Sequence, residues 1–281
     1  VKASGLSSRD VVNAVERRTR PHKVGLAGTL DPLASGVLVV CLGKATRLIE
    51  FVQQQPKRYV AEFQFGLASD TEDIEGEVKP ALEAHIPSAD ELQSVLPKFV
   101  GEIQQRPPAF SALKVKGKRA YDLARQGKTF ELATRGIVIH RLALMEYSSP
   151  RFSLDIECGS GTYVRSLGRD IAGALNSSAV MTSLRRVAVG CFQVDKALTL
   201  NEAIQGDMAT KLLPPAMAVS HLPQLAVSES EVEEIIHGRR IRNSEAPPTG
   251  ECAAISSDGS LVAVLQATND NWLKPKRVLV S

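Results

Sequence analysis

A single aspartate stands between a glycine turn and a proline near the start of the chain, in the run Gly28-Thr29-Leu30-Asp31-Pro32. Proline restricts the residue before it to extended conformations, so the Asp31 carboxylate is carried on a stiff piece of backbone. An ionised carboxylate placed in this way can attack an electrophilic carbon or stabilise a developing positive charge. The same pattern is also typical of a turn or a helix cap, and taken alone it favours that simpler interpretation.

Other residue types that often carry chemistry are scattered along the chain. The four cysteines and five histidines form no C-x-x-C or H-x-x-x-H pair of the kind that binds metals. A G-x-x-x-x-G-K-[ST] phosphate loop is also absent. The sequence therefore predicts a reduced protein that uses no metal and no cofactor.

Positive charge is concentrated in one segment, residues 104–128. Seven lysines and arginines stand there against one carboxylate, a local charge of +6, whereas the whole chain carries +3. Two aromatic residues, Phe110 and Tyr121, are interleaved with the basic ones. Such a segment can be plain solvated surface, but the aromatic residues favour contact with a nucleic acid, whose phosphates dominate binding affinity.

Length and composition limit the class of protein. With 281 residues and 43% hydrophobic content, the chain can form one large domain and one small one. No apolar run approaches the roughly 20 residues of a membrane-spanning helix, and no signal-peptide pattern opens the sequence. We expect a cytoplasmic protein that does not enter membranes.

Helix and strand signals alternate without a regular βαβ rhythm. Capping boxes at Ser88, Thr199 and Ser228 each predict the start of a helix. The strands that we expect cover residues 37–42, 59–65, 137–145, 152–157, 253–255, 261–265 and 277–280. This mixture predicts an α+β fold with a mixed, largely antiparallel sheet flanked by helices.

A proline-rich stretch over residues 213–224 is the best candidate for a domain boundary. We expect a first domain over residues 1–220 and a small β-rich domain over residues 225–281.

The residues around Asp31 resemble the catalytic motif of the TruB family, the bacterial tRNA pseudouridine synthases. The match extends over residues 24–48, VGLAGTLDPLASGVLVVCLGKATRL. Further blocks resemble the family in the same order: Lys2-x-x-Gly5-x-Ser7-Ser8, Lys57-Arg58-Tyr59, the RPPAFSALK and RAYDLARQG runs after residue 105, Gly161-Thr162-Tyr163-Val164-Arg165 and Leu184-Arg185-Arg186. The resemblance implies the pseudouridine synthase fold, with a thumb-like insertion over residues 104–135 and a C-terminal domain similar to PUA domains.

Two positions depart from the family pattern. The family usually has histidine where this chain has Leu26, and that histidine is thought to help flip the target base or to fill its place. Base extrusion is therefore expected to be handled differently around Leu26. The second departure is Ala3, where the family has proline.

The resemblance implies roles for the residues in the other blocks. Asp31 would be the nucleophile, Arg165 would pair with it, and Tyr59 would stack on the uracil and assist removal of the C5 proton. Tyr163 and Leu184 would line the uracil pocket. The expected RNA contacts are Lys2, Phe110, Lys114, Arg119 and Arg125, with Leu26 in the place of the usual histidine.

The expected reaction is isomerisation of uridine to pseudouridine at position 55, in the TΨC loop of tRNA. Its partner would be the tRNA T stem-loop, bound by a monomer without an obligate protein partner. Two alternatives stay open: a guide-RNA-dependent pseudouridine synthase, which the short C-terminal tail disfavours, and a tRNA-folding chaperone in which catalysis is secondary.

Overall fold

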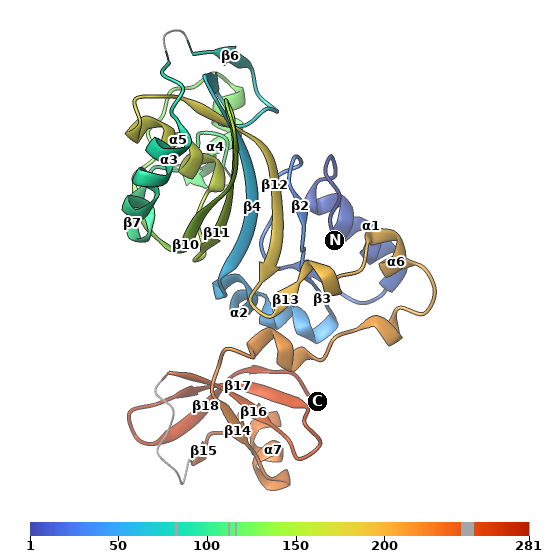
Figure 1. The fold of residues 1–281 in the computed structure, drawn as a ribbon. Helices are drawn as coiled ribbons and strands as arrows, with labels where there is room; N and C mark the ends of the chain where they lie inside the picture. The colour runs from blue at the N-terminus through green and yellow to red at the C-terminus, as the bar shows by residue number, and fades with distance from the viewer. Residues whose placement is uncertain (82–83, 112, 116, 243–249, 281) are drawn as a thin grey trace.

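The computed structural model describes the whole chain except residues 82–83, 112, 116, 243–249 and 281. Its largest unit is a seven-stranded sheet with the strand order β13-β12-β4-β11-β10-β7, in which β2 also pairs with β12 (Figure 1). The strands are β2 (Ser35–Gly36), β4 (Lys57–Phe65), β7 (Gly101–Gln105), β10 (Arg135–Ser148), β11 (Arg151–Cys158), β12 (Ala179–Val189) and β13 (Phe192–Gln193). Neighbouring strands are antiparallel except β2, which is parallel to β12. The predicted α+β class with a largely antiparallel sheet is confirmed.

One face of this sheet is buried because side chains alternate in direction along each strand. In β4, for example, Phe63 and Phe65 are fully buried and the residues between the buried ones are more exposed. The helices α3 (Ala89–Val95) and α5 (Val164–Ala174) cover this face (Figure 1). Their apolar side chains join those of the strands in one cluster, so α5 is held directly against the sheet.

The N-terminal segment packs beside β12 and contributes β2 to the sheet. A capping box between Ser7 and Asp10 starts its first helix. The elements before β4 are α1 (Ser8–Thr19), β1 (Val24–Leu26), β2, β3 (Val40–Leu42), a 3₁₀ helix (Gly43–Leu48) and α2 (Ile49–Gln54).

Two excursions leave the main sheet. The hairpin of β5 (Leu67–Ser69) and β6 (Val78–Pro80) follows β4. Between β7 and β10 the chain forms an insertion of residues 106–134, which contains β8 (Lys114–Val115), β9 (Lys118–Arg119) and α4 (Ala120–Arg125). The predicted basic segment therefore lies almost entirely within this insertion.

A second, five-stranded sheet forms at the C-terminal end, with the order β14-β16-β17-β18-β15. The connection to it carries α6 (Leu200–Ile204) and short 3₁₀ helices. The elements of the second sheet are β14 (Gln224–Ala226), α7 (Glu229–Ile236), β15 (Ile241–Arg242), β16 (Glu251–Ile255), β17 (Leu261–Ala267) and β18 (Trp272–Val278). Capping boxes at Thr199 and Ser228 start α6 and α7, as predicted.

The C-terminal sheet is packed against the N-terminal segment through a common apolar core, which we call the shared cluster. Phe51 and Val52 of α2 belong to this cluster together with Val264 and Leu279 from the C-terminal part. Polar contacts follow the same boundary: Arg277 pairs with Glu50 at 3.0 Å. The second sheet lies directly beside α2 (Figure 1). Among the described residues, no helix is long and apolar enough to cross a bilayer.

Several expected elements differ from those observed. The apolar run 37–42 is not one buried strand: only Val40–Leu42 is a strand. The expected strand 277–280 lies earlier, in β18. The sequence interpretation did not include β7, β12 or α5.

Candidate active site

The backbone on both sides of Asp31 is fixed by hydrogen bonds from the N-terminal segment. The Ser8 hydroxyl accepts from the Leu30 N–H at 2.8 Å and donates to the Leu30 carbonyl at 2.9 Å. On the other side, the Gly5 N–H donates to the Pro32 carbonyl at 2.9 Å. The expected turn is therefore present, and it leaves the Asp31 side chain 41% exposed.

Lys2 lies beneath this turn and is completely buried. Its ammonium donates to the carbonyls of Ala3, Pro32 and Ala34, at 2.9, 3.1 and 2.5 Å. Burial lowers the pKa of Lys2, and the carboxylates around it, Asp31 among them, act in the opposite direction. The structure thus places Lys2 as a support of the Asp31 turn, away from the surface where the sequence interpretation had it contact RNA.

Arg165 connects Asp31 with three other acceptors. This side chain, in the first turn of α5, is only 6% exposed. Its Nε pairs with Oδ2 of Asp31 at 3.0 Å, and its Nη1 pairs with Oδ2 of Asp73 at 3.4 Å. The same guanidinium donates to the carbonyls of Thr71 at 2.7 Å and Phe110 at 3.2 Å. The pairing of Asp31 with Arg165 that the resemblance implies is present in the structure.

Asp73 completes the ion-pair network from the loop between β5 and β6. Its side chain is 3% exposed, so it is a buried carboxylate opposite a buried cation. It accepts from the Thr71 hydroxyl at 2.6 Å and from the Glu75 N–H at 3.0 Å. These bonds fix one oxygen of Asp73 and leave the other to Arg165.

Glu72, next to Asp73, holds the same loop against α5. It has a left-handed backbone, with φ 64°. Its carboxylate accepts from the Ser166 hydroxyl at 2.6 Å and from Arg169, which also donates to the Arg106 carbonyl at 2.8 Å. Burial raises the pKa of Glu72, and the bonds from Ser166 and Arg169 act against this rise.

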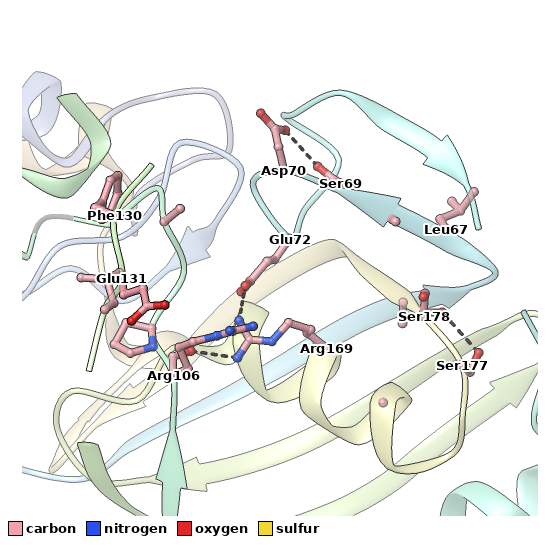
Figure 2. A pocket seen from close by; sticks show the side chains of 16 residues that line it. Leu67, Ser69, Asp70, Glu72, Arg106, Phe130, Glu131, Arg169, Ser177 and Ser178 are labelled. Carbon is pink, nitrogen blue, oxygen red and sulfur yellow. Dashed lines mark hydrogen bonds and ion pairs between the residues drawn. The ribbon is translucent and has the colours of Figure 1, made fainter. Parts of the chain in front are cut away.

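A cavity of about 670 Å³ opens beside this pair of charges. Figure 2 shows Glu72 pointing toward Arg169, with Arg106 close to both. The opposite wall is formed by the end of the insertion, including Phe130 and Glu131. Glu72 and Arg169 line this cavity, whereas neither Asp31 nor Arg165 is among its lining residues.

Tyr59 and Arg186 lie on adjacent strands, and both support the site. Tyr59 is 9% exposed and packs in the main core. Burial raises the pKa of its hydroxyl, and the nearby guanidinium of Arg186 acts in the opposite direction. Arg186 is itself buried and donates to the carbonyls of Val37, Thr29 and Gly28 at 2.8, 3.3 and 3.4 Å. It therefore fixes the backbone that enters the Asp31 turn.

The other residues expected in the pocket occupy different environments. Leu184 is buried in the same core cluster as Tyr59 and Leu30. Tyr163 is half-buried and directly precedes α5, two residues before Arg165. Leu26 is half-buried in β1, paired with Val40 of β3.

Residues expected to grip RNA lie in the insertion. Phe110 is half-buried and its carbonyl accepts from Arg165. Arg119 and Arg125 are exposed, and Arg125 lies over the ring of Tyr121 at 5.7 Å. Lys114 is in β8, and its side chain lies outside the described part of the structure.

Several residues of the site carry no sequence signal that would single them out. Glu72 and Ser166 act through contacts between segments that are 94 residues apart. Arg186 belongs to a block that resembles the family, but its burial under the Asp31 turn follows only from the pairing of β2 with β12.

Comparison with known proteins identifies the family. Residues 16–164 match the family model described as "TruB family pseudouridylate synthase (N terminal domain)", and residues 222–280 match "tRNA Pseudouridine synthase II, C terminal". The chain belongs to the TruB family. Membership agrees with the resemblance that the sequence motifs indicate.

Relatives in the TruB family are similar over most of their length. A protein from Rhodopirellula baltica, named tRNA pseudouridine synthase B, is 39% identical over 88% of this chain and 76% of its own. Proteins of the same name from Xanthomonas campestris and Dehalococcoides mccartyi are 38% and 37% identical, over 99% and 100% of this chain and 91% and 95% of theirs.

Solved structures share the fold at lower identity. A chain from a Cbf5–Nop10–Gar1 complex has a TM-score of 0.77 at 25% identity, covering 99% of this chain and 83% of its own. A chain from an H/ACA RNP bound to a substrate RNA also has a TM-score of 0.77, at 23% identity, over 100% of this chain and 83% of its own. The fold seen here is therefore shared with chains that belong to larger complexes.

Proposed function

We propose that this chain isomerises uridine to pseudouridine at position 55, in the TΨC loop of tRNA, with Asp31 as the catalytic carboxylate. The observation that carries the proposal is the pair of Asp31 and Arg165. A partly exposed carboxylate, 41% accessible, is held by a guanidinium that is 6% exposed and lies 3.0 Å away. The guanidinium keeps the Asp31 carboxylate aimed toward solvent, where a substrate can reach it.

The reaction breaks the C1′–N1 bond of uridine and forms a C1′–C5 bond. N1 gains a proton and C5 loses one, so the reaction needs no redox partner and no added group. The target base first leaves its stack in the RNA, because its reacting atoms are inaccessible inside the folded loop. The Asp31 carboxylate then supplies the negative charge that the cleavage step requires.

Tyr59, Tyr163 and Leu184 form the proposed uracil pocket. An aromatic ring in contact with a base contributes about 1–3 kcal/mol of stacking energy, which keeps the detached uracil in place while it turns. We assign Tyr59 the stacking role and the removal of the C5 proton through its hydroxyl. Leu26 takes the position that the family usually gives to histidine. Its apolar side chain would fill the space that the flipped base leaves through packing alone.

The rest of the chain serves RNA binding in this proposal. Residues 1–220 form the catalytic domain and residues 225–281 the small RNA-binding domain. The insertion, with Phe110, Lys114, Arg119 and Arg125, grips the T stem-loop through its phosphates. Lys2 contributes by supporting the Asp31 turn. The chain works in the cytoplasm as a monomer without an obligate protein partner.

Tritium release from tRNA transcripts labelled at C5 of uridine tests the proposal, with the modified position mapped in the product. Wild-type protein should release tritium from uridine 55, and Asp31→Asn should reduce release below detection. Asp90→Asn, an exposed aspartate in the first turn of α3, is the matched control and should keep full activity.

Two outcomes would reject the proposal. Pseudouridine formation by Asp31→Asn would remove Asp31 from its role. A wild-type protein that refolds misfolded tRNA but forms no pseudouridine would establish the chaperone alternative.

A further inference from the structure

The insertion leaves and re-enters the main sheet at two residues that face each other. Gln105 is the last residue of β7 and Arg135 is the first of β10, and the two are direct partners in the antiparallel ladder. All 29 residues between them belong to the insertion, residues 106–134. The backbone of the insertion is therefore joined to the sheet at this pair.

Both polar atoms of the Gln105 side-chain amide form hydrogen bonds with the backbone of Tyr163. The side chain is completely buried. Its Oε1 accepts from the Tyr163 N–H at 2.9 Å, and its Nε2 donates to the Tyr163 carbonyl at 3.1 Å. A buried amide must satisfy its polar atoms within the protein, so these two bonds fix both the glutamine and the tyrosine backbone.

Arg135 covers the ring of the same tyrosine. Its guanidinium carbon lies 4.8 Å from the ring centroid of Tyr163, within the range of a cation–π contact. It also donates to the carbonyl of Gly161, which has a left-handed φ of 85°. Among the described residues, Arg135 forms no ion pair and its buried Nε has no hydrogen-bond partner, so the ring and the Gly161 carbonyl are its contacts.

Two further bonds connect the first residues of the insertion to α5, directly after Tyr163. Arg169 donates to the Arg106 carbonyl at 2.8 Å, and Arg165 donates to the Phe110 carbonyl at 3.2 Å. The segment 161–169 is therefore held by the base of the insertion at its loop, at its aromatic ring and at its helix.

We propose that Gln105 and Arg135 are positioning residues that hold Tyr163 in the uracil pocket and join this pocket to the RNA-gripping insertion. This inference rests on the proposed function, because it takes Tyr163 as part of the uracil pocket. Gln105 fixes the position of the Tyr163 backbone, and Arg135 fixes the orientation of its ring. Both act through Tyr163 and neither touches the reacting atoms.

Single-turnover rates at saturating tRNA, measured together with the tRNA dissociation constant, test the proposal. Gln105→Met and Arg135→Lys should lower the rate constant by about 10-fold to 100-fold, the range expected when a pocket group shifts by up to about 1 Å. The dissociation constant should change by less than about 3-fold, because the ground-state RNA contacts remain. Arg125→Ala, in the insertion, should instead weaken tRNA binding.

Matched controls come from the same two strands. Gln104→Met alters the exposed neighbour of Gln105, and Arg141→Lys alters an arginine of β10 that pairs with Asp155 at 3.2 Å. Both controls should keep the wild-type rate constant. Loss of rate in either control would mean that strand stability, and not Tyr163, is the cause, and would overturn the proposal.

A double-mutant comparison separates positioning from direct contact with RNA. In a Tyr163→Leu background, Arg135→Met should lower the rate by less than about 2-fold, because the ring through which it acts is gone. A further loss of about 10-fold in that background would show that Arg135 acts on RNA itself and would refute the positioning role.

Fluorotyrosine labelling gives a readout that does not depend on activity. The chain has only four tyrosines, so a uniformly 3-fluorotyrosine-labelled protein gives few ¹⁹F signals, and Tyr163→Phe identifies the relevant one. Gln105→Met and Arg135→Lys should shift the Tyr163 signal and leave the others in place. An unshifted Tyr163 signal would overturn the proposal even where a variant is too unstable for kinetics. If wild-type protein forms no pseudouridine, the proposed function fails, whereas a fully active wild type with unaffected variants defeats the positioning role alone.

Discussion

Replacement of Arg165 by lysine should separate the geometry of the ion-pair network from its charge. The arginine fork reaches Asp31 through Nε, Asp73 and the Thr71 carbonyl through Nη1, and the Phe110 carbonyl through Nη2. A lysine ammonium is one point of charge at the end of a flexible stem and cannot occupy these directions at the same time. Arg165→Lys therefore keeps the positive charge and loses most of the contacts.

The effect on stability should come mainly from Asp73. Its side chain is 3% exposed, and hydrogen bonds to charged groups in such positions contribute about 1.5–3 kcal/mol each. Asp31 is 41% exposed, so solvent screening reduces its share to about 0–1 kcal/mol. We expect Arg165→Lys to lower the free energy of unfolding by about 2–3 kcal/mol. Arg165→Met leaves Asp73 buried without a cation and should cost about 3–5 kcal/mol.

The effect on catalysis should be larger and should come from Asp31. Loss of the Nε contact frees the carboxylate to move by about 1 Å, which corresponds to a rate loss on the order of 100-fold. Asp73→Asn keeps the contact between Arg165 and Asp31, so its rate loss should stay below about 10-fold. From fastest to slowest, the expected order of single-turnover rates is wild type, Asp73→Asn, Arg165→Lys and then Arg165→Met.

Tritium release at saturating tRNA and urea unfolding at pH 7 give the two measurements. Arg141→Lys serves as the control, because Arg141 pairs with Asp155 outside the site. Full activity in Arg165→Lys would refute the reasoning, since charge alone would then be sufficient. A slower rate in Asp73→Asn than in Arg165→Lys would also refute it, because the aim of Asp31 would then depend on Asp73.

Three further predictions concern the structure around the site. A Cβ atom on Gly168 would lie 2.1 Å from a ring carbon of the buried Phe63, so Gly168→Ala should lower the free energy of unfolding by about 1–3 kcal/mol, measured from urea transitions. Burial, and secondarily Arg186, lowers the pKa of Lys57 to about 8, so the native state disfavours the protonated amine. The unfolded state therefore binds more protons than the native state between pH 8 and about 10.4. The free energy of unfolding of wild type, relative to that of Lys57→Met, should rise over that range by up to about 3 kcal/mol. A difference between the two proteins that does not change with pH would contradict this. Glu72→Gln removes the charge opposite Arg169 and should lower the free energy of unfolding by about 1–2 kcal/mol in the same urea assay. Glu77→Gln, at an exposed residue directly before β6, is the control and should cause no loss.

Local sequence signals predicted the parts of the fold that depend on neighbouring residues. The capping boxes at Ser88, Thr199 and Ser228 each start a helix where expected, because the box is completed within four residues. The alternation in β4 likewise marks its buried face. By contrast, β12 was not predicted, although it pairs with β4 on one side and with β13 and β2 on the other. Its burial pattern does not alternate regularly, because bulges near Ser183 and Ala188 shift its register.

The candidate site divides in the same way. The motif around Asp31 and the block around Arg165 are recognisable in sequence, and their pairing follows from the resemblance. The contacts of Glu72 with Ser166 and of Gln105 with Tyr163 cross 94 and 58 residues of chain. Such contacts depend on how the hairpin and α5 pack on the sheet, and no local pattern encodes them. The departure at Leu26 is visible in sequence, but its effect on base extrusion depends on the RNA.

The shared cluster between α2 and the C-terminal sheet has a thermodynamic consequence. Phe51, Val52, Val264 and Leu279 each lose their apolar surroundings if either part of the chain opens. Unfolding of the C-terminal sheet would therefore expose the apolar surface of α2. We therefore expect the two parts of the chain to unfold cooperatively, and a calorimetric scan should contain a single transition. A chain cut before residue 222 would keep the whole Asp31 turn and Arg165, yet it would carry an uncovered apolar face and tend to aggregate.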